Sequence, residues 1–159
     1  MFVLGVDPGL TTMGYGVIRE RGPALVSAGV LRTSAGDPIE QRLGELYNDL
    51  TEVIAEFRPT VMAIEQIFLN KNRATAIGVA RASGVAILAA ANHGMVVREF
   101  TPTTVKQAIA GYGNAEKRQM QKMVAARLRL SDLPKPADAA DALAVALCYF
   151  QTTKFEALA

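Results

Sequence analysis

The sequence has few of the residues on which thiol, redox and transition-metal sites depend. Its 159 residues include one cysteine, Cys148, and one histidine, His93. A single cysteine cannot form an internal disulfide, and within the apolar run LAVALCYF it indicates a buried thiol in a cytoplasmic protein. His93 stands in the turn ANHG and is expected at the surface. The sequence therefore offers no Cys/His metal cluster, and it also lacks a GxxxxGKS/T phosphate-binding loop.

Long apolar runs are absent as well. None approaches the roughly 20 residues that a membrane-spanning helix needs, so no membrane association is expected. The N-terminus, MFVLGVDPG, lacks the basic flank of a signal peptide and indicates a strand. With 50% hydrophobic and 20% charged residues, the composition is typical of a soluble globular protein. We expect one domain over residues 1–152 and a frayed tail over residues 153–159.

Acidic residues are scarce in the middle of the chain. Residues 71–130 hold 10 Lys/Arg against 2 Asp/Glu, whereas residues 1–70 hold 5 against 9, and the whole chain has a net charge of +2. This asymmetry suggests a basic surface that could bind a polyanion. From charge alone, the basic residues could equally well lie on solvated helix faces that bind no polyanion.

Apolar patterning and turn residues predict an α/β domain. The expected strands are FVLGVDPG, MGYGVIRE and ALVSAGVLRT, which would form an antiparallel meander, followed by TVMAIE and MVVREF. Helices are expected from about Pro38 to Phe57, over the Ala/Gly-rich stretch to about Asn92, from Thr101 to a break at Gly111, from Ala115 to Leu130, and from beyond Pro136 to near Phe150. This order predicts a mixed five-stranded sheet, with three antiparallel strands and then two parallel ones, flanked by helices.

Four acidic residues stand where these elements begin or end. Asp7 and Glu65 close two apolar strands, and Asp138 and Asp141 lie at i, i+3 spacing in PADAADALAVAL, on one helix face. Each has an ordinary explanation, since Asp-Pro-Gly forms turns, Glu65 could be a solvated strand end, and Asp138 could complement a helix dipole. However, a carboxylate that closes a buried strand is costly unless it is paired or bound to a cation. As a set, the four predict one metal-binding hydrolytic centre.

Carboxylate oxygens are the ligands that Mg²⁺ prefers, and no histidine or cysteine is required. Two divalent cations about 4 Å apart serve phosphodiester hydrolysis, because they shield the phosphate, activate water and stabilise the leaving oxygen. The sequence therefore predicts two Mg²⁺ ions per active site, with Mn²⁺ as a substitute.

The motifs VLGVDPGLTTMGYGVI, AIEQIF, AEKRQ and DAADALAVAL together resemble the RuvC family of Holliday-junction resolvases along nearly the whole chain. The resemblance implies an RNase H-like fold. It assigns Asp7, Glu65, Asp138 and Asp141 as metal ligands, although some relatives carry histidine at the position of Asp138. It also implies that Lys106 and Lys117 lie near the scissile phosphate, where a lysine could steady negative charge. The alternative for both is a phosphate-backbone contact or a solvated lysine.

The resemblance further implies a structure-selective endodeoxyribonuclease of recombination and DNA repair. Such an enzyme nicks two strands of like polarity symmetrically in a four-way junction, and leaves 5′-phosphate and 3′-hydroxyl ends. It would act as a homodimer with a branch-migration motor. The Ala/Gly-rich helix over residues 74–91 could pack against a twin, since a C2 dimer matches the symmetry of a junction.

Further residues are candidates for contact with DNA. Phe68 could stack on an unpaired base near the strand-exchange point, or it could belong to the core. The basic candidates, expected to bind the phosphate backbone without reading sequence, are Lys71, Arg73, Arg118 and Lys122. Gly9 and Gly14, with Thr11 and Thr12 between them, could let the backbone pass close to the metals, or could form only a tight hairpin.

Three rival functions remain open at the level of sequence. A related RNase H-like nuclease could act on structured RNA or an RNA–DNA hybrid, as in pre-ribosomal-RNA processing. An ATP-handling protein of the actin and sugar-kinase type has a similar first strand and turn, but it needs a second domain that 159 residues do not provide. A junction-binding scaffold with an inactive site is disfavoured by four intact carboxylates. No side chain indicates which DNA sequence would be cut.

Overall fold

The two turns near the N-terminus produce the antiparallel meander that the sequence predicts. In the computed structural model, which describes residues 1–68 and 73–158, β1 spans Phe2–Asp7, β2 Thr12–Arg19 and β3 Ala24–Arg32. β4, Val61–Glu65, and β5, Val96–Phe100, continue the sheet in parallel with β1. The strand order is β3-β2-β1-β4-β5, so the mixed five-stranded sheet is confirmed.

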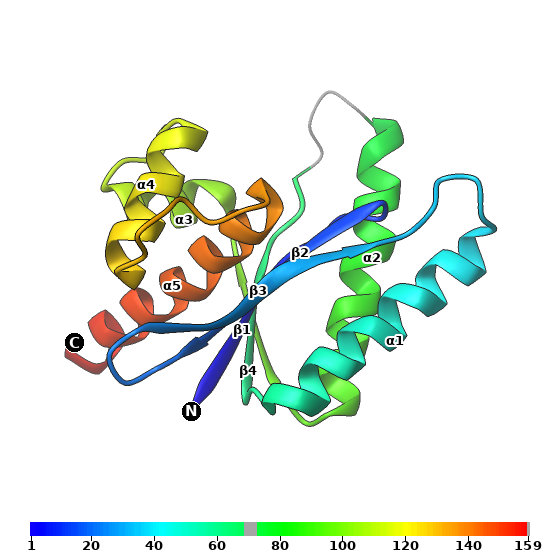
Figure 1. Ribbon diagram of the computed structural model, residues 1–159, viewed down its shortest axis with the longest axis horizontal. Helices are drawn as coiled ribbons and strands as arrows, with labels where there is room; N and C mark the ends of the chain where they lie inside the picture. The colour runs from blue at the N-terminus through cyan, green and yellow to red at the C-terminus, as the bar shows by residue number, and fades with distance from the viewer. Residues whose placement is uncertain (69–72, 159) are drawn as a thin grey trace.

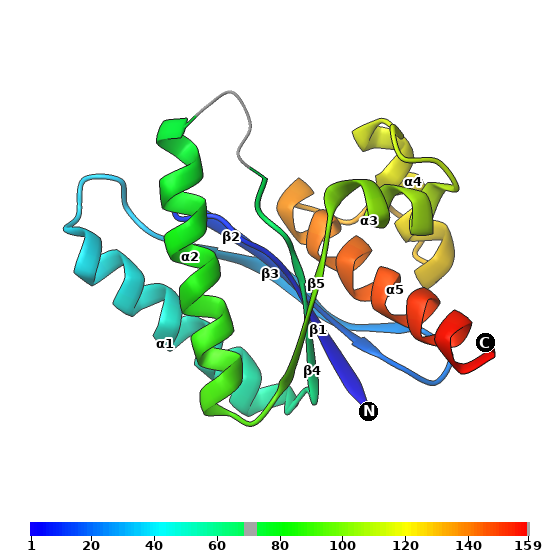
Figure 2. The same cartoon turned by 180° about the vertical axis from the view of Figure 1, so that it is seen from behind.

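Helices cover both faces of this sheet. α1, Ile39–Phe57, and α2, Arg73–Asn92, pack on one face. α3, Pro102–Ala110, α4, Lys117–Leu128, and α5, Ala137–Leu158, form the layer on the other face. The two helical layers are separated by the sheet in both front and rear views (Figures 1 and 2). Among the described residues the fold is therefore a three-layer α/β arrangement, with one apolar core on each side of the sheet.

α1 behaves as its apolar pattern predicts. Leu46, Leu50, Val53 and Ile54 recur on one helical face and are buried against the sheet and α2. The helix ends at Arg58, which adopts the left-handed conformation and donates its backbone N–H to the carbonyl oxygen of Ile54. Pro59 then separates α1 from the buried strand β4.

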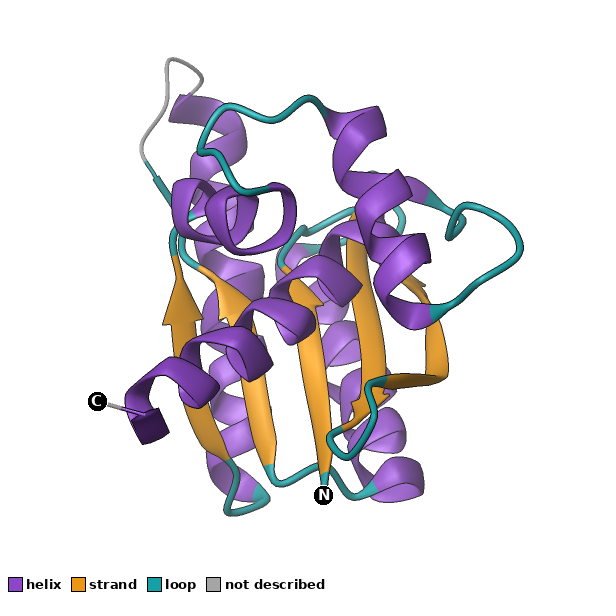
Figure 3. Ribbon diagram, turned by 90° about the vertical axis from the view of Figure 1, so that its left-hand side faces the viewer, coloured by secondary structure: helices purple, strands orange, loops and turns teal. Residues whose placement is uncertain are grey.

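α5 lies directly on the sheet and crosses its strands diagonally (Figure 3). Apart from the half-buried Asp141, its residues from Ala139 to Cys148 are buried, because the helix is enclosed between the sheet and the α3–α4 layer. Glycines in the strands allow this close approach: a Cβ atom at Gly5 would lie 2.0 Å from the carbonyl oxygen of Ala142. At Gly16 an added Cβ would lie 2.5 Å from Cδ2 of Leu143. The strands therefore hold the backbone of α5 at a distance that no larger residue permits.

The prediction that the last helix ends near Phe150 is wrong, since α5 continues to Leu158. Thr152 donates its hydroxyl to the carbonyl oxygen of Cys148 at 2.9 Å, and Thr153 donates to that of Tyr149 at 2.9 Å. These bonds back to the preceding turn satisfy both hydroxyls within the helix. The two threonines therefore lie within the helix, although in the sequence they suggest its end. The segment predicted as a frayed tail is helical as far as Leu158.

The single cysteine is buried, as predicted. Cys148 has no exposed surface, and burial raises the pKa of its thiol to about 11 although Thr152 lowers it slightly. A thiol with this pKa is almost wholly protonated near neutrality and is unreactive in the folded protein. His93 is exposed, which also agrees with the prediction.

The expectation that no segment could span a membrane needs one qualification. α2 is long and apolar enough by length and composition alone, with a mean hydropathy of 1.6 over its best window. The same composition is found in helices that pack inside a domain, and Ala82, Ala86 and Ala90 of α2 are buried in the core against α1 and the sheet. Only 28% of that window is buried, and its exposed part includes Ile77 and Leu88.

Candidate metal centre

Three of the four predicted acids meet where β1 ends and α5 begins. Carboxylate oxygens of Asp7, Asp138 and Asp141 lie within 4.8 Å of one another, and all three side chains are half-buried. Asp7 is the last residue of β1, while Asp138 and Asp141 occupy the first turn and a half of α5. The i, i+3 spacing turns both α5 carboxylates toward the strand end, as the sequence predicts.

Glu65 lies beside this group rather than within it. β4 runs parallel to β1 with Val6 paired to Ile64, so Glu65 follows at the same edge of the sheet as Asp7. Glu65 and Asp7 line one cavity of about 250 Å³, and Glu65 and Asp141 line a second of similar volume. Glu65 therefore stands between two cavities, one lined also by Asp7 and the other by Asp141.

Gly14 fixes how closely Asp138 approaches Asp7. Gly14 pairs with Asp7 across the β1–β2 ladder, so it faces α5 at the level of the acidic group. A Cβ atom on Gly14 would lie 2.0 Å from the carbonyl oxygen of Asp138 and 2.5 Å from its carbonyl carbon. Such contacts are far shorter than van der Waals packing allows, so only glycine permits the observed position of the first turn of α5.

A hydrogen-bond network holds the turn that follows Asp7. Arg42 of α1 donates to the hydroxyl of Thr33 at 2.9 Å and to that of Thr11 at 3.0 Å. Thr33, which is buried, donates in turn to the carbonyl oxygen of Leu10 at 2.7 Å. The β1–β2 turn is thereby anchored to α1 and β3, which stabilises the direction in which the chain leaves Asp7. Sequence reasoning missed Arg42 and Thr33, because their partners are distant in the chain.

The acidic group is electrostatically unfavourable without a cation. Burial first, and then the charges of Asp141, Glu65 and Asp138, raise the pKa of Asp7 to about 8, while Lys117 opposes this shift. Burial followed by nearby carboxylate charge likewise raises the pKa values of Glu65 and Asp141. Converging carboxylates that resist ionisation fit a divalent cation with oxygen ligands, since its charge would reverse these shifts.

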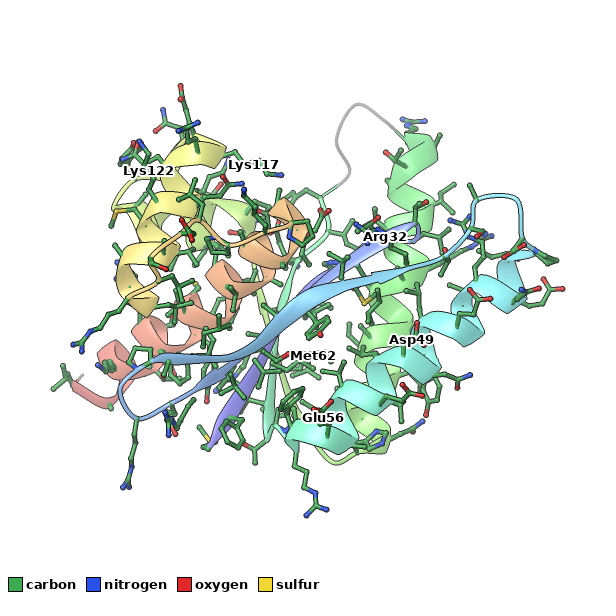
Figure 4. The ribbon with its side chains drawn as sticks, in the orientation of Figure 1. Arg32, Asp49, Glu56, Met62, Lys117 and Lys122 are labelled. Atoms are coloured by element: carbon green, nitrogen blue, oxygen red, sulfur yellow. The ribbon has the colours of Figure 1, made fainter. Side chains whose placement is uncertain are left out.

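Two lysines border the acids. Lys117, the first residue of α4, places its Nζ 3.2 Å from Oδ2 of Asp141, and this contact is the main cause that raises the pKa of Lys117. Figure 4 shows Lys117 on the side of α4 toward the start of α5, with Lys122 on the opposite side. Lys106 of α3 is half-buried and lines the second cavity together with Lys117, Glu65 and Asp141. The structure thus brings both predicted lysines to the acidic centre.

The other predicted DNA contacts lie at varying distances from the centre. Phe68 is 57% exposed and lines the first cavity with Asp7 and Glu65, so the alternative that it belongs to the core does not hold. Arg73 is exposed at the first residue of α2, and Arg118 and Lys122 are exposed on α4. Lys71 lies outside the described residues.

The raised pKa of Asp7 predicts that the metal-free protein becomes less stable as pH rises. Its carboxyl ionises near 3.8 when unfolded but near 8 when folded, so the stability that it contributes is complete below the first value and is lost through the second. In chelator we expect the melting temperature to fall between pH 5 and pH 8. Asp7→Asn should flatten this fall and raise the melting temperature at pH 8 by on the order of 5 °C. Parallel profiles for the two proteins would contradict this cause.

The fold and the acidic centre together define an RNase H-like nuclease domain. A family model described as crossover junction endodeoxyribonuclease RuvC matches residues 3–149. The crossover junction endodeoxyribonuclease RuvC of Chloroflexus aggregans is 51% identical over 154 residues, covering 96% of this chain and 94% of that protein. The RuvC of Alkaliphilus metalliredigens is 46% identical over 160 residues, covering 99% and 98%. The chain therefore belongs to the RuvC family, as its motifs predict.

A solved structure supports the same conclusion at the level of fold. T. thermophilus RuvC in complex with a Holliday junction substrate matches with a TM-score of 0.93 and 36% sequence identity, covering 98% of this chain and 96% of that one. The RNase H-like fold predicted from the sequence is thus confirmed along nearly the full length.

Proposed function

We propose that this protein is a crossover junction endodeoxyribonuclease that resolves four-way DNA junctions. It nicks two strands of like polarity symmetrically and leaves 5′-phosphate and 3′-hydroxyl ends that a ligase can seal, in homologous recombination and DNA repair. The observation that carries the proposal is the convergence of Asp7, Asp138 and Asp141 within 4.8 Å at one end of the sheet. Full-length similarity to junction endonucleases supports the same substrate.

In this proposal the metal ligands are Asp7, Glu65, Asp138 and Asp141. Two Mg²⁺ ions fit the set best, with Mn²⁺ as a substitute, because the donors are carboxylate oxygens alone. When bound, the ions shield charge on the phosphate and lower the pKa of the attacking water. Glu65 stands apart from the three aspartates, which suits ligation of a second ion on its side of the centre.

The chain's own residues position the substrate around these acids. Lys106 and Lys117 line the cavity that adjoins Glu65 and Asp141, and their ammonium groups bind nonbridging oxygens of the scissile phosphate there. Arg118 and Lys122 on α4, with Arg73 and Lys71, bind the backbone of the junction arms and make the affinity dependent on salt. Phe68, exposed beside Glu65, stacks on a base exposed at the crossover.

Lys117 and Lys122 provide a matched pair of variants, since both are exposed lysines of α4 but only Lys117 touches the acidic centre. Lys117→Ala should lower the single-turnover cleavage rate by about 100-fold, the usual loss when one electrostatic stabiliser of the transition state is removed. Lys122→Ala should change the rate by less than about threefold and mainly reduce the salt dependence of binding. Equal losses of rate in both variants would place Lys117 among the general backbone contacts.

A homodimer would present two such centres to the two-fold symmetry of a junction. The outer face of α2 offers an interface for it: Ile77 is 59% exposed and Leu88 54%, and the small residues Ala80 and Gly84 lie between them on the same face. Two copies of this face could approach closely and remove the apolar side chains from water. The mass of the protein in solution, and its change in Leu88→Glu, tests this interface.

The working partners also belong to the proposal. A branch-migration motor would deliver junctions to the dimer, and the cytoplasm is the compartment where a bacterial chromosome is accessible.

A nuclease for structured RNA or RNA–DNA hybrid is the alternative, since an acidic centre of this kind also suits RNA cleavage.

Side-by-side cleavage assays separate these functions. Labelled four-way junction, linear duplex, RNA–DNA hybrid and structured RNA are each incubated with the protein in Mg²⁺ or in chelator. We expect paired nicks in the junction alone, dependent on Mg²⁺ and sealed by ligase. Cleavage of hybrid or structured RNA in preference to the junction would instead establish the alternative, and junction binding without cleavage in any metal would indicate a scaffold.

A further inference from the structure

Asp7 lies at the very end of its strand, so its position depends on the turn that follows it. β1 ends at Asp7, which pairs with Gly14 in the β1–β2 ladder. The chain then turns over residues 8–11 before β2 begins at Thr12. A Cβ atom on Gly9 would lie 2.0 Å from the carbonyl oxygen of Thr12, so the turn is tightly closed on the start of β2. A displacement of this turn is therefore passed on to Asp7.

Thr33, directly after β3, holds two consecutive carbonyl groups of this turn. Its side chain is buried, and its hydroxyl donates to the carbonyl oxygen of Leu10 at 2.7 Å. Its backbone N–H donates to the carbonyl oxygen of Thr11 at 3.0 Å. The position of Thr33 therefore sets the position of the turn.

Arg42, in the first turn of α1, connects the hydroxyl groups of both threonines. Its Nε donates to Oγ1 of Thr33 at 2.9 Å, and its Nη2 donates to Oγ1 of Thr11 at 3.0 Å. Because the Thr33 hydroxyl accepts a hydrogen bond from Arg42, its own proton is left for the carbonyl oxygen of Leu10. The guanidinium thus completes a chain of hydrogen bonds that runs from α1 to the turn after Asp7.

α2 provides a further contact that keeps the turn in place. A Cβ atom on Gly78 would lie 3.3 Å from Cδ2 of Leu10 and 3.5 Å from its Cβ, so the Leu10 side chain packs on α2 at this glycine. Loss of Arg42 therefore loosens the turn without releasing it, and variants of Arg42 are expected to fold.

We propose that Arg42 is a positioning residue for the metal centre. Through Thr33 and Thr11 it fixes the turn after Asp7, and it thereby sets the affinity of the acidic group for divalent cations. Mg²⁺ demands near-ideal octahedral geometry, so a small displacement of one carboxylate lowers this affinity. The inference rests on the proposed function and deepens it, because Arg42 acts from α1, which contributes none of the four proposed ligands.

Two pairs of variants separate the hydrogen bonds from other effects. Arg42→Met removes the donors but keeps a long apolar stem. Gln41→Met is its matched control, since Gln41 is an exposed neighbour on α1 whose amide donates to Glu45. Thr33→Val removes the hydroxyl on which the chain of bonds depends, whereas Thr33→Ser keeps it. Thermal melting in chelator establishes that each variant is folded.

Calorimetric titration with Mn²⁺, in the absence of DNA, measures metal affinity directly. We expect the Kd to rise about tenfold in Arg42→Met and in Thr33→Val, the usual loss when a group that orients a metal ligand is removed. The double variant should stay well below the product of about 100-fold, because both changes break the same chain of bonds. Thr33→Ser and Gln41→Met should bind Mn²⁺ within about twofold of wild type.

Single-turnover cleavage of a labelled four-way junction provides the second measurement. In Arg42→Met the half-saturating Mg²⁺ concentration should rise by the same factor of about ten, while junction binding in chelator stays within about twofold of wild type. Weaker junction binding with unchanged Mn²⁺ affinity would make Arg42 a DNA contact and refute the positioning role. A lower melting temperature with unchanged Mn²⁺ affinity would make Arg42 a purely structural residue and would also refute it.

The outcomes for the proposed function are separate. Wild type that binds Mn²⁺ but leaves the junction uncut refutes the nuclease function, while the calorimetric comparison of the variants still decides the role of Arg42. Wild type that binds neither Mn²⁺ nor Mg²⁺ refutes both, because the acidic group then holds no cation for Arg42 to influence.

Discussion

Asp7→Asn will abolish junction cleavage and leave junction binding within about twofold of wild type. Asparagine keeps the shape of aspartate but loses the charge that a divalent cation requires, at the residue whose pKa is raised by all three of the other acids. Loss of one charged ligand is worth several kcal/mol of transition-state stabilisation, so the rate should fall by about three orders of magnitude. Single-turnover cleavage in Mg²⁺ and equilibrium binding in Ca²⁺ measure the two quantities separately.

Asp132→Asn is the matched control, since Asp132 is an exposed aspartate in the segment before α5. It should cleave at the wild-type rate. Loss of binding as well as cleavage in Asp7→Asn would mean that Asp7 supports the fold and not the chemistry. Asp7→Asn is also expected to melt at a higher temperature than wild type in chelator, so instability cannot explain its inactivity.

Gly14→Ala will impair metal binding through a single added methyl group. That Cβ would lie 2.0 Å from the carbonyl oxygen of Asp138, so either β2 or the first turn of α5 must move by about 1 Å or more to restore ordinary contact. A displacement of this size at a reacting centre costs about 100-fold in rate. We expect the half-saturating Mg²⁺ concentration to rise about tenfold, because Asp138 moves relative to Asp7.

Gly16→Ala is the control that distinguishes displacement of Asp138 from a general loss of packing between β2 and α5. Gly16 lies two residues further along β2, and its added Cβ would lie 2.5 Å from Cδ2 and 2.8 Å from Cγ of the Leu143 side chain, whereas the nearest backbone atom, the nitrogen of Leu143, would be 3.3 Å away. This variant should lose about 1–3 kcal/mol of stability through overpacking while its metal dependence stays unchanged. If both variants shift the Mg²⁺ requirement equally, or if Gly14→Ala shifts neither rate nor requirement, Gly14 does not set the geometry of the centre.

Local sequence patterns predict the strands, the first four helices and the four acids, because each leaves a signature within a few residues. Strand β1 is an apolar run that ends in Asp-Pro-Gly, and α1 repeats its apolar residues with helical period. The end of α5 is different: Gln151, Thr152 and Thr153 suggest a stop, yet the threonine hydroxyls bond within the helix.

Contacts between distant segments could not be predicted in this way. In the sequence, only their residue types suggest that Asp7 and Asp141 share a site. Their approach in the structure depends on Gly5, Gly14 and Gly16, which lie in the strands beneath α5. Glycine inside a strand signals a close backbone approach, but not which segment approaches. The placement of Glu65 between two cavities depends in the same way on α3, which starts 37 residues later at Pro102.

The labelling rate of the buried thiol of Cys148 can report transient opening of the protein around α5. It lies on α5 two turns beyond Asp141, with its sulfur 3.9 Å from the carbonyl oxygen of Thr104 on α3, so a maleimide can reach it only when these two helices separate transiently. The labelling rate therefore follows the population of that open state. An ion that ties the first turns of α5 to β1 would slow labelling at a distance, so that a colorimetric thiol assay could follow metal binding without any DNA present.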